Sequence, residues 1–239
     1  MAKKPQMIRL PPPRNSNQAL NAEHVVYIGT TGSGKTTAVK KMGLVPKGSQ
    51  AAFFDPYENY SGKRFQGQQV RGFREFAPFA RALVAGRASG KPFKIALIKE
   101  ATPENVEMFA RVIWSLGDGN KPLFHVVVEE LASASETAGK LQGKAGELWR
   151  GGRQYGLVMH SCFQRPQEVP KTVISQSPMW WVGALQSQVD AVYVNKARGV
   201  SVSELSSLKS AKNNNGIAEY MLIGEGVGNV KKGKFNCKT

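Results

Sequence analysis

A glycine-rich segment near the start of the chain constrains the fold more than any other feature of the sequence. Residues 29–36 read GTTGSGKT and meet the pattern G-x-x-x-x-G-K-[ST] in full. A β-rich run ends at Gly29, and a helix-compatible stretch begins at Lys35. Gly32 and Gly34 permit backbone conformations that side chains would obstruct, so that successive N–H groups can turn inward around phosphate oxygens. The segment therefore predicts a strand, a phosphate-binding loop and a helix in succession.

The same loop predicts a ligand. We expect Lys35 to reach the β- and γ-phosphates of ATP and the Thr36 hydroxyl to ligate Mg²⁺. The expected nucleotide-binding residues are Gly29, Thr30, Thr31, Gly32, Ser33, Gly34, Lys35, Thr36 and Thr37. The alternative is a glycine-rich turn that matches the pattern without binding phosphate, and the agreement of strand, loop and helix disfavours it.

The rest of the chain predicts an α/β fold with a parallel sheet, because short apolar runs alternate with longer helix-compatible stretches. The predicted strands are 25–29, 51–55, 94–98, 123–128, 157–162 and 179–184, and the predicted helices are 35–43, 74–85, 103–115, 136–150 and 187–197. Residues 216–223 and 227–235 are typical of a terminal β-hairpin, whereas 201–215 is polar and either partly helical or mobile. No composition shift marks a boundary, so we expect one domain over residues 21–239.

The charge balance is the unusual part of the composition. The 239 residues include 33 Lys plus Arg against 17 Asp plus Glu, a formal net charge of +16. Such an excess is typical of a partner of nucleic acid, and a basic surface without a dedicated partner is the alternative. Residues 1–20 are basic and contain three consecutive prolines, which predicts an extended arm. We expect this arm to contact nucleic acid, to contact a neighbouring subunit or to be a solvated tail.

Several protein classes are excluded by the composition. Cys162 and Cys237 have neither the number nor the spacing of a disulfide framework or a zinc site, which favours a reducing compartment. No apolar run approaches the roughly 18 residues that span a bilayer. The basic N-terminus lacks the apolar stretch of a signal peptide. We therefore expect a cytoplasmic protein without a transmembrane segment.

A buried strand that ends in two acids supplies the expected second half of a nucleotide site. Residues 123–128 are nearly all apolar, which predicts a central strand, and Glu129 and Glu130 follow directly. We expect Glu129 to hold the hydrated Mg²⁺ and Glu130 to act as general base toward the attacking water. Glu129 is one methylene longer than the usual Asp, and an acidic helix start is the alternative. His125, inside the run, is more typical of a hydrogen-bonded core residue.

Two downstream segments complete a recognisable order of motifs. Residues 152–156 read GRQYG, and residues 164–166, after an apolar run, read QRP. A further segment after the second predicted strand contains Phe54-Asp55-Pro56 and Tyr60. With the phosphate loop and the paired glutamates, this order resembles the FtsK–HerA superfamily of P-loop DNA pumps over roughly residues 24–185.

The resemblance implies a fold and a set of roles. The fold is a RecA-like three-layer α/β sandwich of the additional-strand catalytic-glutamate type, with a mainly parallel central sheet and a C-terminal β-hairpin. Gln164 would sense the γ-phosphate within its own subunit, and an arginine from a neighbouring subunit would complete the site. Arg153 is the first choice by motif position and Arg150 the second, with a helix C-terminal cap as the alternative for either. Asp55 and Tyr60 would line the nucleotide or DNA side, or be structural.

Within this superfamily, the chain is most similar in its size and in its lack of a transmembrane stretch to the genome-packaging ATPases of membrane-containing icosahedral viruses. This implies an ATP-hydrolysing DNA translocase that packages a genome into a preformed capsid. Its partners would be double-stranded DNA bound without sequence preference, further copies in a hexameric or pentameric ring, and virion vertex proteins. It would act in the host cytoplasm or in the virion. Candidates for DNA backbone contacts are Lys63, Arg64, Arg71, Arg74, Lys140 and Lys144.

Two other functional classes share such a phosphate loop. A P-loop kinase of a small molecule or nucleotide would need an arginine-rich lid and a shaped acceptor pocket, which the scattered basic residues do not mark. A non-motor adaptor would use the nucleotide as an assembly switch. Stimulation of ATP hydrolysis by DNA favours the motor, whereas phosphoryl transfer to a small acceptor by a monomer favours the kinase.

Overall fold

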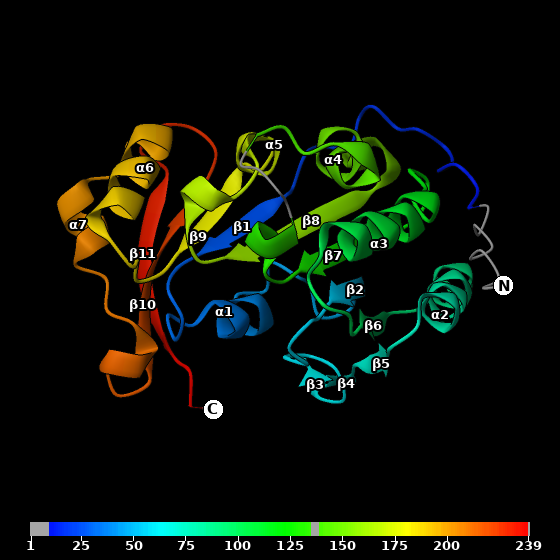
Figure 1. Ribbon diagram of the computed structural model, residues 1–239, viewed down its shortest axis with the longest axis horizontal. Helices are drawn as coiled ribbons and strands as arrows, with labels where there is room; N and C mark the ends of the chain where they lie inside the picture. The colour runs from blue at the N-terminus through cyan, green and yellow to red at the C-terminus, as the bar shows by residue number, and fades with distance from the viewer. Residues whose placement is uncertain (1–9, 135–138, 239) are drawn as a thin grey trace, which may run out of the picture.

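The structure is a computed structural model, and it describes residues 10–134 and 139–238 (Figure 1). Most strands join one sheet, formed by β1 (Val25–Ile28), β2 (Gln50–Phe54), β5 (Arg71–Phe73), β6 (Phe93–Leu97), β7 (Phe124–Val128), β8 (Leu157–Phe163), β9 (Met179–Val182), β10 (Ile217–Ile223) and β11 (Val230–Asn236). A separate small ladder pairs β3 (Arg64–Phe65) with β4 (Gln68–Gln69).

Helices connect these strands. The α-helices are α1 (Lys35–Lys41), α2 (Phe76–Ser89), α3 (Pro103–Ser115), α4 (Gly143–Arg150), α5 (Lys171–Ser175), α6 (Gln188–Arg198) and α7 (Val202–Ser206). Single turns of 3₁₀-helix are η1 (Leu131–Ala134), η2 (Gly152–Tyr155), η3 (Pro166–Glu168) and η4 (Ala211–Asn213). No helix within the described ranges combines the length and the apolarity that crossing a membrane requires.

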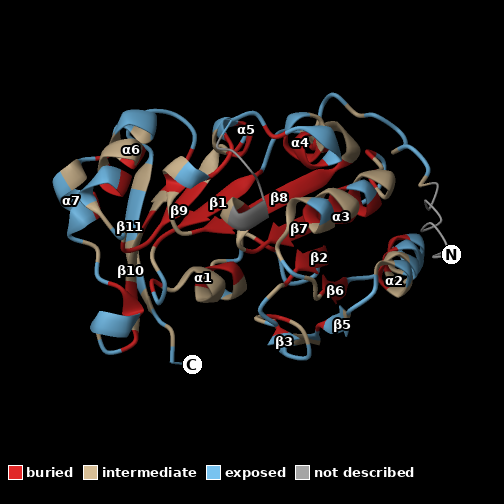
Figure 2. Cartoon of the chain, in the orientation of Figure 1, coloured by how far each residue is buried: buried red, intermediate tan, exposed pale blue. Residues whose placement is uncertain are grey.

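Side chains of the sheet enter two separate cores. Val26 and Ile28 of β1 belong to a large cluster that also contains residues of α2, α3, α4 and α6. Val25 and Tyr27 belong to a second cluster with α1, and side chains of the terminal hairpin pack against it. Successive strand residues point to opposite faces, so a strand buried on both faces needs cover on both. Figures 1 and 2 show this arrangement, with α3, α4 and α5 above the buried central strands and α1 below them. The predicted three-layer sandwich is confirmed.

The strand order places the functional motifs. The sheet runs β11-β10-β9-β1-β8-β7-β2-β6-β5, and neighbouring strands are parallel from β9 to β5. Strand β8 lies between β1, which precedes the phosphate loop, and β7, which precedes the two glutamates. This is the additional strand that the family resemblance implied. The residues that follow β1, β7 and β8 therefore meet at one edge of the sheet, which we name the carboxyl edge.

The predicted elements agree with the structure to within two residues at each end, with three exceptions. The helix predicted over 74–85 extends to Ser89, the strand predicted from 227 begins at Val230, and one helix begins late. Each strand predicted before the terminal hairpin is present within two residues, and β10 and β11 form the predicted antiparallel hairpin. The helix predicted over 136–150 begins only at Gly143, and residues 135–138 lie outside the described residues. Gly143 has a φ of 62°, and the Glu107 carboxylate of α3 accepts the N–H groups of Lys144 and Ala145 at 3.1 and 2.9 Å. These bonds provide acceptors for two N–H groups of the first helical turn, which have no partner within the helix. The short elements β3, β4, β5 and α5 were not predicted, because two to five residues carry little periodicity. Helix α7 lies within 201–215, where the sequence left partial helix and mobility open.

The second half of the predicted arm lies against the domain. The Arg14 N–H donates to the Gly117 carbonyl at 3.0 Å, and the Asn17 N–H donates to the Gln154 carbonyl at 2.8 Å. The Asn15 amide donates to the Asp118 carboxylate at 2.8 Å. The interpretation as a solvated tail is therefore wrong for residues 14–17, whereas residues 1–9 lie outside the described part of the chain.

Candidate nucleotide-binding site

The phosphate loop depends on two of its glycines. Gly32 and Gly34 have φ values of 78° and 102°, in the left-handed region that favours glycine. A Cβ atom on Gly32 would lie 3.0 Å from the Cβ of Lys212, and one on Gly34 would lie 2.8 Å from the Cβ of Ala218. Both glycines are therefore required by the backbone conformation and by close packing against the C-terminal part of the chain.

Lys35 is held inside the loop. Its ammonium group donates to the carbonyls of Gly29 and Thr30 at 2.6 and 3.2 Å. Burial lowers the pKa of Lys35, while the nearby carboxylates of Glu129 and Glu130 act in the opposite direction. The loop itself is tied to the end of β9, because the Thr30 N–H donates to the Ala184 carbonyl at 2.8 Å. The predicted phosphate-binding lysine is thus positioned by the backbone of its own loop.

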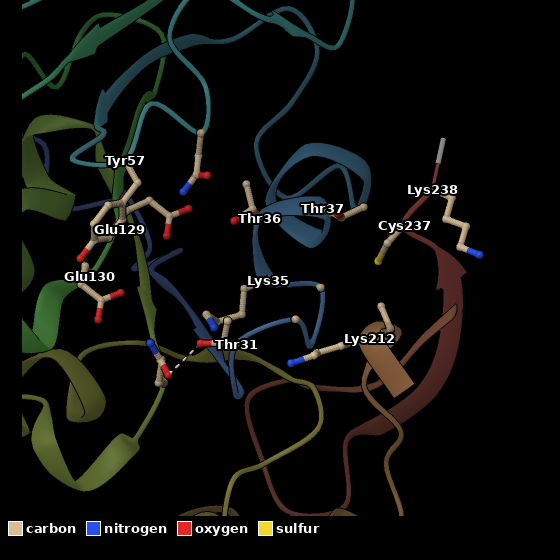
Figure 3. Close-up of a pocket in the computed structure, with 15 residues that line it drawn as sticks. Thr31, Lys35, Thr36, Thr37, Tyr57, Glu129, Glu130, Lys212, Cys237 and Lys238 are labelled. Atoms are coloured by element: carbon tan, nitrogen blue, oxygen red, sulfur yellow. Dashed lines mark hydrogen bonds between the residues drawn. The ribbon is translucent and has the colours of Figure 1, made fainter. Parts of the chain in front are cut away.

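A cavity of about 580 Å³ opens over the loop (Figure 3). Its lining includes the predicted residues Thr31, Gly32, Gly34, Lys35, Thr36 and Thr37. Glu129, Glu130 and Gln164 also line it, so three segments far apart in the sequence meet here. Gly29, Thr30 and Ser33 are not part of the lining, and Ser33 is completely buried. These three residues belong to the loop but do not face the cavity.

Glu129 is a buried acid with a specific partner. Only 5% of the residue is exposed, and the buried Tyr60 hydroxyl donates to its Oε1 atom at 2.5 Å. Burial raises the pKa of Glu129, whereas the bond from Tyr60 and the charge of Lys35 lower it. Tyr60 therefore acts on the site through Glu129 rather than by lining the cavity, a role that the sequence did not distinguish.

Asp55 has a structural role. It is completely buried, and its carboxylate accepts the backbone N–H groups of Asn59, Tyr60 and Ser61 at 2.7, 3.0 and 2.8 Å. These bonds organise the turn after β2, which carries Tyr60 toward Glu129. Of the two roles that the sequence left open for Asp55, the structure favours support of this turn.

Glu130 occupies an unfavourable backbone conformation. Its φ is 53°, in the left-handed region, and its side chain lines the cavity. A non-glycine residue held there costs about 1–3 kcal/mol and persists when the surroundings demand it. The strain points to a functional requirement for the side chain at this position.

Gln164 is joined to the phosphate loop. The Thr31 hydroxyl donates to its Oε1 atom at 3.2 Å, shown by the dashed line in Figure 3. The bond connects the residue after β8 with the loop after β1. The structure therefore brings together the residue expected to sense the γ-phosphate and the loop expected to bind it.

Arg153 and Arg150 lie away from this cavity. Arg153 belongs to η2, which precedes β8, whereas Gln164 follows β8. The strand has seven residues, so roughly 23 Å of sheet separates the two side chains. Arg153 donates to the carbonyls of Gln18 and Leu20 at 3.1 and 2.7 Å. Arg150 donates to the Leu141 carbonyl at 2.7 Å and pairs with Glu147 at 2.8 Å. Neither arginine reaches the cavity of its own chain.

The cavity also contains residues that the sequence did not single out. They are Tyr57, Asn59, Ala211, Lys212, Cys237 and Lys238. The last four come from η4 and from the end of the chain, which the pairing of β10 with β9 brings beside the phosphate loop. A polar stretch without periodicity carries Lys212, so no local pattern identifies it.

The oxygen donors of the cavity fit Mg²⁺ that arrives with a nucleotide. Across the described residues, no group of three or more His, Cys, Asp or Glu side chains is arranged to hold a metal ion. The cavity does offer the Thr36 hydroxyl and the Glu129 carboxylate. Mg²⁺ typically takes one or two protein oxygens and completes its shell with phosphates and water. The hydroxyl of Thr36 and the carboxylate of Glu129 are therefore a sufficient set of protein ligands for Mg²⁺.

Comparisons with known proteins agree with this architecture. No family model matches the chain. Protein P9 of Pseudoalteromonas phage PM2 is 32% identical over 167 residues, which cover 70% of each chain. The genome packaging NTPase B204 of Sulfolobus turreted icosahedral virus 2, solved with AMP, superimposes with a TM-score of 0.65 at 13% identity, over 88% of this chain and 96% of B204. VirB4 of Thermoanaerobacter pseudethanolicus gives a TM-score of 0.59 at 10% identity, over 90% and 89% of the two chains. The solved structures therefore share the fold of this chain, and the chain belongs to the family of Protein P9 of Pseudoalteromonas phage PM2.

Proposed function

We propose that this chain is an ATP-hydrolysing motor that moves double-stranded DNA into a preformed viral capsid as a homo-oligomeric ring. The observation that supports this proposal most directly is the set of residues that line the cavity. The carboxyl edge holds the phosphate loop, Glu129, Glu130 and Gln164, while no arginine is among the described residues that line the cavity. A head-to-tail ring would bring the opposite edge of one subunit, with Arg153, to the cavity of the next.

The residues at the carboxyl edge have distinct roles in this proposal. The phosphate loop and Lys35 bind the β- and γ-phosphates, and Gln164 responds to the γ-phosphate through its contact with Thr31. Glu130 takes a proton from the attacking water as general base. Thr36 and Glu129 would hold Mg²⁺, which neutralises charge on the phosphates when it is bound.

The neighbouring subunit would supply the arginine that the described lining of the cavity lacks. An arginine that enters the site in trans neutralises charge developing on the transferred phosphoryl group. Arg153 is our first candidate and Arg150 our second. Hydrolysis at each interface would then depend on the geometry between subunits, which is how a ring couples chemistry to movement along DNA.

The partners follow from charge and from the relatives. B204, which shares the fold, is a genome packaging NTPase that was also solved with ATPγS. The net charge of +16 suits a sequence-independent grip on the DNA backbone, with affinity that falls steeply as salt rises. Virion vertex proteins would be the docking partners, and the host cytoplasm or the virion the place of action.

The test combines the ATPase rate with and without double-stranded DNA and the molecular mass in solution. We expect DNA to stimulate hydrolysis in an oligomeric species, and we expect Lys35→Ala to abolish it because the phosphates lose their principal cation. A monomer that hydrolyses ATP at the same rate with and without DNA would refute the motor. Phosphoryl transfer by that monomer to a small acceptor would identify a kinase instead.

A further inference from the structure

A second lysine faces the phosphate loop from the C-terminal part of the chain. Lys212 belongs to η4, between α7 and β10. Its backbone N–H donates to the Gly32 carbonyl at 3.2 Å, so η4 is docked directly on the loop. Figure 3 shows its side chain extending from η4 across the loop toward Thr31 and Lys35, and the residue lines the cavity.

The position of Lys212 is fixed by the turn that carries it. Ala211, the preceding residue, is buried, and its carbonyl accepts the Gly216 N–H at 2.9 Å. The Gly216 carbonyl in turn accepts the Cys237 N–H at 2.7 Å, which ties the turn to the end of the chain. The Ser210 hydroxyl accepts the Asn213 N–H at 3.3 Å at the start of η4. An exposed side chain thus stands on a firmly bonded backbone.

The ammonium group of Lys212 is available for a ligand. Within the described part of the chain it has no hydrogen bond or ion pair, whereas the ammonium of Lys35 is bonded to two loop carbonyls. Two cations that face one cavity repel each other, and a polyanion bound between them would remove that repulsion. In Figure 3, Glu129 and Glu130 lie on the far side of Lys35 from Lys212, so neither acid stands between the two lysines.

We propose that Lys212 binds the phosphates of the nucleotide in its own subunit, as a second lysine opposite Lys35. The inference rests on the nucleotide site of the proposed function and extends it to the C-terminal segment. Phosphate binding by Lys212 would then be transmitted to the terminal hairpin, because η4 is bonded to the phosphate loop and directly precedes β10. Binding through Lys212 favours a nucleoside triphosphate over a monophosphate, which carries fewer phosphate groups to contact.

The direct test measures the dissociation constants of ATP, ADP and AMP for Lys212→Ala and for a matched control, Lys209→Ala. Lys209 is an exposed lysine of the same segment that does not line the cavity. We expect Lys212→Ala to weaken ATP binding about tenfold, in the range of one charge-assisted contact at an exposed site, and to leave AMP within about twofold. Lys212→Arg retains a cation and is expected to preserve most of the affinity.

Cys237 offers an independent readout in the same protein. Its thiol lines the cavity, whereas Cys162, the other cysteine, is completely buried. Bound ATP should therefore slow the alkylation of Cys237, and about tenfold more ATP should be needed for the same protection in Lys212→Ala. The thermal unfolding midpoint of each variant shows whether it is folded, since the backbone bond of Lys212 to Gly32 does not involve the side chain.

The outcomes separate this inference from the nucleotide site itself. Equal ATP affinity for Lys212→Ala and Lys209→Ala, with Lys35→Ala defective, would overturn the role of Lys212 and leave the site intact. Undiminished ATP binding by Lys35→Ala would reject the nucleotide site on which the inference depends. An equal loss of ATP and AMP affinity in Lys212→Ala would also overturn the proposal, because contact with the β- and γ-phosphates affects ATP alone.

Discussion

Polar side chains are arranged differently at the carboxyl edge of the central sheet and at the opposite edge, where the parallel strands begin. At the carboxyl edge, Lys35, Glu130 and Gln164 converge on one cavity, and Glu130 is held in a strained conformation. At the opposite edge, Arg150 and Arg153 are bonded to carbonyls of their own chain. One edge therefore presents groups toward a ligand, while the other uses its arginines to hold neighbouring segments in place.

The comparison shows that residues of the predicted motifs differ in their effect on the stability of the fold. A glutamate held at a φ of 53° weakens the fold, and we propose that Glu130 is retained there for its role as general base. An arginine that bonds the backbone of residues 18–20 strengthens the fold, whatever it does across an interface. We therefore expect a substitution that relieves the strain at Glu130 to raise stability, and a substitution of Arg153 to lower it, while both reduce ATP hydrolysis.

The largest expected effect is that of Arg153→Ala at the opposite edge. If this arginine acts in trans, ATP hydrolysis by the assembled protein falls on the order of 10³- to 10⁵-fold. Mixing Arg153→Ala with Glu130→Gln subunits should restore part of the ATPase rate, because some interfaces then combine a normal arginine with a normal glutamate. The thermal midpoint should also fall, since bonds to Gln18 and Leu20 are lost.

A purely structural Arg153 gives a different pattern. In that case the thermal midpoint falls, and no mixing ratio restores the hydrolysis rate above that of the separate variants. Gln18→Ala is the matched control, because it removes a side-chain partner of Arg153, together with the bonds of Gln18 to Gln154 and Ser16, and leaves the guanidinium in place. Loss of activity in Gln18→Ala as severe as in Arg153→Ala would favour the structural role.

At the carboxyl edge, Glu130→Gln should lower the single-turnover rate of ATP cleavage on the order of 10²- to 10⁴-fold while ATP still binds. Glu130→Gly should lose activity to the same extent but raise the free energy of unfolding by about 1 kcal/mol, because glycine relieves the strain at φ 53°. Urea titration measures the second effect. A destabilised Glu130→Gly would show that the backbone at this position is not strained.

Between the edges, three buried histidines make the sheet sensitive to acid. Burial lowers the pKa of His24 and of His125 from 6.5 to about 4, and it also lowers the pKa of His160 well below its ordinary value. The unfolded chain therefore binds protons that the native state excludes, and stability falls as the pH drops from about 6.5 to about 4. Between pH 7 and 5 each of His24 and His125 should cost about 2 kcal/mol.

The hydrogen bonds identify the histidine to replace first. His125 and His160 are bonded to each other at 3.0 Å, and the Tyr27 hydroxyl is bonded to His160 at 3.2 Å, so protonation disrupts a connection between β7, β8 and β1. Urea unfolding of His125→Gln as a function of pH checks the slope. A slope unchanged from that of the native chain would contradict titration of His125.

The smallest expected effect concerns the support of Glu129. Tyr60→Phe removes the hydroxyl that bonds Glu129, and loss of such a supporting bond typically costs about 10- to 100-fold in metal affinity. We expect binding of an ATP analogue to need that much more Mg²⁺, while metal-free binding stays unchanged. Tyr155→Phe, at the opposite edge, is the control. An unchanged Mg²⁺ requirement would mean that Tyr60 only packs the core.

The strand–loop–helix unit, the central strands and the acids that follow β7 were all predictable from the sequence. Local periodicity sets each strand, and the residues after parallel strands share one edge, so the meeting of the phosphate loop with Glu129, Glu130 and Gln164 follows from their places in the pattern. The one wrong helix start, at 136 instead of Gly143, depends on a carboxylate from α3, which no local pattern contains.

Only the tertiary structure decided which distant residues complete the site. The bond of Tyr60 to Glu129 and the docking of Lys212 on Gly32 join segments 69 and 180 residues apart, and both depend on the order of strands in the sheet. Strand order is set by packing of whole elements, not by the residues within any one of them. The sequence by itself therefore determined the phosphate loop and its acids, while the fold determined their supporting tyrosine, the second lysine and the remote position of Arg153.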